Sequence, residues 1–108
     1  MRYLFAIAIC GAMAVGQSKG NPQNGRALFE KNGCWQCHGH EGQGGLAGPR
    51  LAQTKFSQIA FTAYVRNPPS GGMPPYRPKV MSDQELSDVF AFIQSIPEPA
   101  KNIPLLNP

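Results

Sequence analysis

The chain has 108 residues, a length that limits it to one small domain. Its formal net charge is +4, and because the sequence contains no basic run, this charge argues against a nucleic-acid partner. Twelve glycines and eleven prolines predict that much of the chain forms loops. A hydrophobic core alone is marginal at this size, so the composition indicates a domain that needs a further stabilising group.

The N-terminal residues 1–16 are typical of a secretory signal peptide. Arg2 supplies the positive start, and the apolar run that follows, residues 3–15, is too short to span a bilayer comfortably. Cys10 lies within this run behind a large residue, so we expect it to be removed with the peptide rather than lipidated. We therefore expect a protein exported to the periplasm that meets the membrane only through this segment. An uncleaved membrane anchor is the alternative.

The first helix is expected shortly after the signal peptide. Residues 17–23 are polar and predict a flexible lead. Asn24 has the side chain of a helix N-cap, so we expect the helix over residues 25–32. Gly33 is suited to end it.

The run C-W-Q-C-H at residues 34–38 carries the most specific chemical signature, because C-x-x-C-H is the pattern by which a haem is attached covalently. Thiols one helical turn apart, here Cys34 and Cys37, can reach the two vinyl groups on one porphyrin edge, and His38 then becomes the proximal iron ligand. A thioredoxin-like dithiol would need a βαβ context, and a structural zinc would need ligands from a second segment. A disulfide between these two cysteines would close a strained, tiny loop. The pattern favours one covalent haem c with its iron.

In these residues the chain resembles the monohaem c-type cytochromes of class I. The resemblance implies an all-α, cytochrome c-like domain over residues 24–97, with three to four helices wrapped around one haem. It also implies that Gly25 and Phe29 of the first helix meet an aromatic residue of the last helix, which Phe92 matches.

The glycine-rich residues 39–48 are expected to wrap one edge of the flat cofactor; they do not fit a phosphate-binding loop, because no Lys-Ser/Thr pair follows. His40 is expected to be a solvated loop histidine. The resemblance implies that the Pro49 carbonyl accepts a hydrogen bond from His38, which would fix the orientation of a metal-bound imidazole. We expect Leu51 to contact the porphyrin.

A second helix is predicted over residues 57–66, because an apolar stripe there is followed by Asn67-Pro68-Pro69, which stops a helix. Tyr64 and Arg66 are candidates to bond a haem propionate. The alternative is a buried tyrosine and an exposed arginine.

The sixth iron ligand of the family is a methionine on a loop before the last helix, often followed by proline. Met73 matches this setting, and Pro74 and Pro75 would stiffen its loop. Met81 is expected to be a core residue instead.

The last helix is predicted from a capping box, with Ser82 as N-cap and Glu85 three residues later. Apolar residues recur at helical spacing beyond it, and Pro97 ends the pattern. Residues 98–108 are proline-rich and predict an extended tail, apolar enough to lie on the domain or on a partner.

With His38 and Met73 on both sides of the iron, no open site would remain, so we expect an electron carrier rather than an enzyme. Its partners would be redox proteins, such as a dehydrogenase, an oxidase or another cytochrome. Basic residues expected to border the haem and to steer an acidic partner are Arg50, Lys55, Arg66, Arg77 and Lys79. The alternatives are a haem subunit of a larger complex, a five-coordinate haem sensor or enzyme if Met73 does not bind, and a non-haem redox or zinc module.

Overall fold

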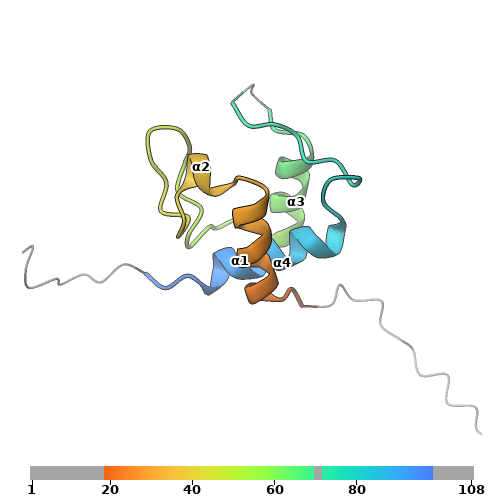
Figure 1. Ribbon diagram of the computed structural model, residues 1–108, viewed down its shortest axis with the longest axis horizontal. Helices are drawn as coiled ribbons and strands as arrows, with labels where there is room; N and C mark the ends of the chain where they lie inside the picture. The colour runs from red at the N-terminus through yellow and green to blue at the C-terminus, as the bar shows by residue number, and fades with distance from the viewer. Residues whose placement is uncertain (1–18, 70–71, 99–108) are drawn as a thin grey trace, which may run out of the picture.

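The computed structural model describes residues 19–69 and 72–98. The predicted signal peptide and nearly all of the predicted tail lie outside these residues. The described part contains helices and no strand, which confirms the all-α fold. Its helices are α1 (Pro22–Lys31), α2 (Trp35–His38), α3 (Gln58–Arg66) and α4 (Asp83–Ser95) (Figure 1). None of the described helices combines the length and apolar character needed to cross a membrane.

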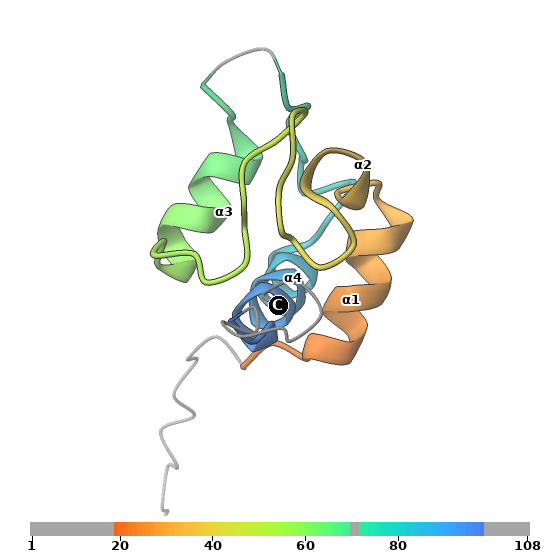
Figure 2. The ribbon, with the colours of Figure 1, turned by 90° about the vertical axis from the view of Figure 1, so that its left-hand side faces the viewer.

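Helices α1 and α4 cross in close contact (Figure 2). A Cβ atom added at Gly25 would overlap the backbone carbonyl of Asp88 in α4, so only glycine permits this approach. The rings of Phe29 and Phe92 meet edge to face, with centroids 5.3 Å apart. The expected contact of Gly25 and Phe29 with Phe92 is therefore confirmed.

The start of α1 differs from the prediction. Asn21, not Asn24, is the N-cap, and its side chain accepts two backbone N–H groups of the first turn. Pro22 occupies the first helical position, where its missing N–H costs nothing. Asn24 lies inside the helix and donates its side-chain amide to Asp88 at 2.7 Å. The helix thus begins within the predicted lead 17–23, while the division into domains stays a prediction.

Helix α4 supplies most of the core. Its capping box is confirmed, because Ser82 and Glu85 each accept a hydrogen bond from the other's backbone N–H. The buried apolar residues of α4 are Leu86, Val89, Phe90, Phe92 and Ile93. Each such burial is worth about 1.5–3 kcal/mol relative to exposure. Met81 is only 2 % exposed and joins this cluster, as expected of a core residue.

Helix α3 begins after the N-cap Ser57 and ends at Arg66, which confirms the second predicted helix. It stands on one side of the domain, with α1 and α2 on the other and α4 at the base between them (Figure 2). The connection after α2, residues 39–57, and residues 72–82 before α4 run between these two sides (Figure 2). This arrangement positions the site.

Candidate haem site

A cavity of about 830 Å³ lies between α3, the C-x-x-C-H segment and the two long connections. This volume is within the range of about 300–1,000 Å³ that binds cofactors and other small molecules. The predicted site residues that line it are Cys34, Cys37, His38, Pro49, Leu51, Tyr64 and Met73. Residues far apart in the sequence are thus brought to one apolar enclosure.

The single-turn helix α2 places both cysteines at the cavity wall. The N–H of Cys37 and that of His38 both donate to the Cys34 carbonyl, at 3.3 and 3.0 Å, so the motif is wound as one tight turn. Both thiols are free, with Cys34 half-buried and Cys37 exposed. They are therefore available for two thioether bonds on the same side of the cavity.

The environment of Cys34 does not resemble that of a reactive dithiol. Burial raises the pKa of its thiol, and hydrogen bonds with the backbone and with Tyr76 offset this only in part. Burial and the neighbouring Cys34 likewise raise the pKa of the Tyr76 hydroxyl. Redox-active and nucleophilic cysteines typically have a lowered pKa, so the shift at Cys34 is opposite to the one that favours a thiolate.

His38 is buried, 7 % exposed, with its ring held by one hydrogen bond. Its Nδ1 lies 2.7 Å from the carbonyl oxygen of Pro49, so the predicted bond is present. A carbonyl only accepts, which requires Nδ1 to carry the proton and leaves Nε2 with a free lone pair. This is the arrangement that orients an imidazole ligand and raises its basicity.

Two methionines, Met73 and Met81, line the cavity, and they differ in how deeply they are buried. Met81 is 2 % exposed and fixed in the core, whereas Met73 is half-buried on the connection before α4. Leu51 is also half-buried at the cavity wall. The positions of Met73 and Leu51 fit their predicted roles, which stay predictions.

The contacts of Arg66 lie outside the cavity, and its predicted propionate role stays a prediction. Its guanidinium donates to the backbone carbonyls of Tyr76, at 3.0 Å, and Met81, at 2.6 Å, and pairs with Asp83 at 2.7 Å. With these partners Arg66 is turned away from the cavity, and its side chain is only 13 % exposed. This low exposure differs from the alternative of an exposed arginine.

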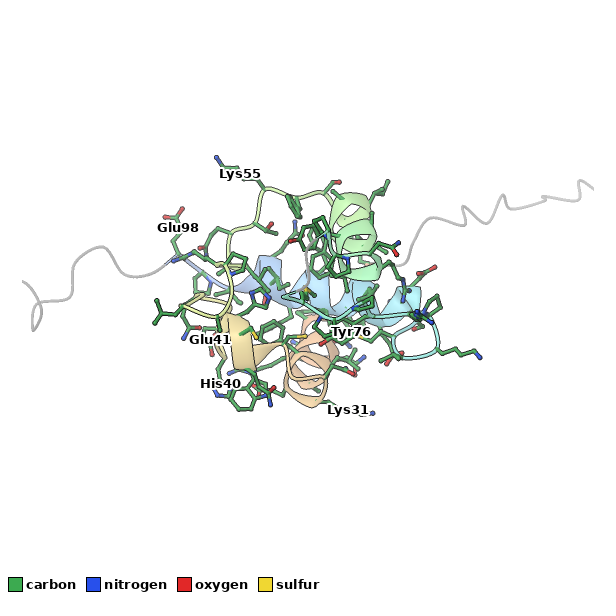
Figure 3. The ribbon with its side chains drawn as sticks, turned by 90° about the horizontal axis from the view of Figure 1, so that it is seen from above. Lys31, His40, Glu41, Lys55, Tyr76 and Glu98 are labelled. Carbon is green, nitrogen blue, oxygen red and sulfur yellow. The ribbon has the colours of Figure 1, made fainter. Side chains whose placement is uncertain are left out.

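Tyr64 is exposed at the cavity rim, with its ring tilted against Phe56 at a centroid distance of 6.0 Å. A propionate bond from its hydroxyl stays a prediction. Arg50 and Lys55 also line the cavity, and Figure 3 shows Lys55 projecting outward from its wall. Arg77 and Lys79 are exposed on the turn before α4 and do not line it.

His40 is exposed, as expected of a loop histidine. Its ring stacks on Trp35 at 4.5 Å, and its Nδ1 lies 2.8 Å from a carboxylate oxygen of Glu30, away from the cavity (Figure 3). Among residues 19–69 and 72–98, no three His, Cys, Asp or Glu side chains are grouped to hold a bare metal ion. The candidate ligands His38 and Met73 fit a haem instead, because a porphyrin brings four nitrogen ligands and would need only axial ligands from the protein.

Tyr76 is a site residue that the sequence reasoning missed. Its side chain lines the cavity, its hydroxyl donates to the Asn32 carbonyl at 3.0 Å, and its N–H donates to the Val65 carbonyl at 3.0 Å. An aromatic residue directly after Met73 and two prolines was the available signal.

Comparison with protein families agrees with this site. Residues 20–93 match the family model described as cytochrome c oxidase, cbb3-type, subunit III, which spans more than half of the chain. The chain belongs to this family. The resemblance to c-type cytochromes is therefore confirmed, and the domain serves haem-based electron transfer. Neither the curated proteins nor the solved structures gave a match.

Proposed function

We propose that this cytochrome is an exported, periplasmic carrier of single electrons. It holds one haem c through Cys34 and Cys37, with His38 and Met73 as axial ligands. The observation that carries the proposal is that these four side chains line one cavity while the Nδ1–H of His38 donates a hydrogen bond to the Pro49 carbonyl. Nε2 of His38 and the thioether of Met73 are then the two axial donors.

The ligand pair defines what the site can do. When bound, a haem supplies an iron that alternates between Fe(III) and Fe(II). With His38 and Met73 both bound to the iron, no position would be left for a substrate or oxygen. A thioether favours Fe(II) and raises the reduction potential, as do apolar side chains such as Leu51 around the iron. If His38 and Met73 hold the iron in both oxidation states, little rearrangement would oppose electron transfer.

The redox partner would dock at the cavity rim. Arg50 and Lys55 line this rim and would steer a partner with an acidic surface. A dehydrogenase, an oxidase or another cytochrome fits this description. Export by the segment 1–16 is part of the same proposal and is tested by N-terminal sequencing of protein purified from the periplasm.

A second candidate is a haem subunit held permanently in an oxidase. The description of the matched family, which names an oxidase subunit, favours it. The chemistry at the iron would be the same, and only the partner would differ. The native mass of the protein, purified from the membranes and periplasm of its source cells, would distinguish a free carrier from a subunit of a complex.

The ligand assignment is tested by replacing each cavity methionine. Met73→Ala should abolish the ferric thioether-to-iron absorption band and allow the ferrous protein to bind carbon monoxide. Met81→Leu, which conserves core volume, should keep the band. The reverse pattern, with the band lost only in Met81→Leu, would contradict the assignment of Met73.

A further inference from the structure

We propose that Arg66 and Tyr76 are positioning residues that hold the Met73 segment, residues 72–81, at the cavity and so limit displacement of Met73 by other ligands. The proposal rests on the proposed function, because it takes Met73 as an iron ligand. It adds to that function two residues that are not iron ligands themselves but determine how firmly Met73 is held at the iron.

Arg66 binds both ends of one turn. A single nitrogen, Nη1, donates to the carbonyl of Tyr76 at 3.0 Å and to that of Met81 at 2.6 Å. Between these two residues, the N–H groups of Val80 and Met81 both donate to the Arg77 carbonyl, at 2.8 and 3.0 Å. The turn is therefore closed on itself and fastened to the last residue of α3.

Tyr76 fastens the same segment at two further points. Its N–H donates to the Val65 carbonyl at 3.0 Å, one of the last carbonyls of α3, which have no partner within the helix. Its hydroxyl donates to the Asn32 carbonyl at 3.0 Å, two residues before Cys34. Tyr76 thus connects the end of α3 with the segment that carries the first attachment cysteine.

Met73 is coupled to these anchors through a short, stiff connection. Only Pro74 and Pro75 separate it from Tyr76, and each proline fixes its own φ angle. The backbone of Met73 is therefore restricted to a short distance from Tyr76 once Tyr76 is held. Moving the segment away would break the bonds of Tyr76 and leave the mostly buried guanidinium of Arg66 without two of its acceptors, which is costly.

This coupling predicts a measurable competition. An added ligand such as imidazole binds the iron only in molecules in which Met73 has left. Its apparent affinity therefore rises in proportion to the fraction of such molecules. Weakening the anchors should tighten apparent imidazole binding, even though neither residue is proposed as an iron ligand.

The experiment is an imidazole titration of the ferric, haem-loaded protein, followed through the thioether-to-iron band. Tyr76→Phe removes one hydroxyl and keeps the ring, so we expect about fivefold tighter apparent binding. Arg66→Lys replaces the planar guanidinium by an ammonium group, and we expect the apparent imidazole affinity to increase on the order of tenfold or more. The matched control is Asp83→Asn, which removes the exposed partner of Arg66, a carboxylate side chain 83 % exposed, and leaves both carbonyl bonds. This control should stay within about twofold of the wild type.

Urea unfolding of the same variants separates positioning from general stability. A purely structural role would lower the urea midpoint and leave imidazole affinity unchanged. If the wild type shows the thioether band but both variants bind imidazole with unchanged affinity, the positioning role is overturned and the proposed function is not. A wild-type protein without the band would overturn the proposed function, and this proposal with it.

Discussion

The helix crossing and the cavity wall are stabilised in different ways. At the crossing of α1 and α4, side chains of the chain itself fill the contact, as the pair of Phe29 and Phe92 illustrates. The wall facing the cavity is mostly irregular chain, fastened at separate points such as the bonds from Leu51 and Ala52 to the Gly42 carbonyl, at 2.8 and 2.9 Å. Its inner side encloses about 830 Å³ and so needs a bound group to pack against.

The difference teaches which part of the domain depends on the cofactor. The crossing of α1 and α4 has a hydrophobic core of its own, whereas the irregular wall lines the candidate haem site. A small domain with a limited core commonly obtains its remaining stability from a bound group. We expect loss of the haem to loosen the wall first and the crossing last.

The largest expected effect comes from removing the attachment. Cys34→Ala combined with Cys37→Ala should abolish covalent haem completely, so that mass spectrometry under denaturing conditions finds only the bare polypeptide. Hydrogen exchange should then rise more in residues 39–57 than in α1 and α4. Equal loss of protection in both parts would break the distinction between them.

A direct attack on the crossing is Gly25→Ala. The added Cβ would overlap the Asp88 carbonyl, and neither backbone can give way without moving its helix. We expect the free energy of unfolding to fall by about 3 kcal/mol, measured by urea denaturation.

The matched control for this substitution is Gly45→Ala in the cavity-side connection. A Cβ at Gly45 meets nothing within 4 Å, so the change should stay within about 0.5 kcal/mol. Equal effects of the two alanines would mean that the crossing is not the tightly packed part.

Asp88 makes the crossing sensitive to acid. Burial raises the pKa of its carboxyl, but hydrogen bonds from the Asn21 N–H and the amides of Asn24 and Gln84 outweigh this and lower it. The folded-state pKa therefore lies below the unfolded value of about 3.9. The stability gained from the carboxylate is complete above that pH and is lost as the pH falls through the folded pKa.

Asp88→Asn should accordingly cost about 2 kcal/mol at neutral pH. The cost should shrink when the two proteins are compared in urea below about pH 4. A difference that stays constant with pH would show that the charge of Asp88 does not contribute.

The smallest expected effect concerns a surface link between the two parts. Arg26 of α1 pairs with Glu41 of the cavity-side connection at 2.9 Å, and both side chains are more than half exposed. Glu41→Gln should change the free energy of unfolding by less than about 1 kcal/mol, and less still at high salt. A larger change in urea denaturation would mean that the parts are coupled through this surface.

Local patterns predicted much of the fold and part of the site. The capping box of Ser82 and Glu85 and the C-x-x-C-H turn depend on residues a few positions apart, and both are present. The His38–Pro49 bond spans a short loop and was predicted through the family resemblance.

What could not be predicted depends on distant chain segments. Asn24 was predicted to cap the first helix, but Asn21 caps it, and Asp88 of α4 binds both, Asn21 through its backbone N–H and Asn24 through its side chain. Arg66 was predicted as a candidate for a propionate bond. The acceptors that it has in the structure, the carbonyls of Tyr76 and Met81, approach it only once the following turn has formed.

The central claim is that His38 and Met73 close both axial positions of one covalent haem. It is tested most directly by optical spectra of the purified protein, ferric and ferrous, with and without carbon monoxide. The account predicts sharp low-spin ferrous bands, a ferric thioether-to-iron band and no response to carbon monoxide. A high-spin spectrum that shifts with carbon monoxide would contradict it, and would indicate an open iron suited to ligand sensing or catalysis.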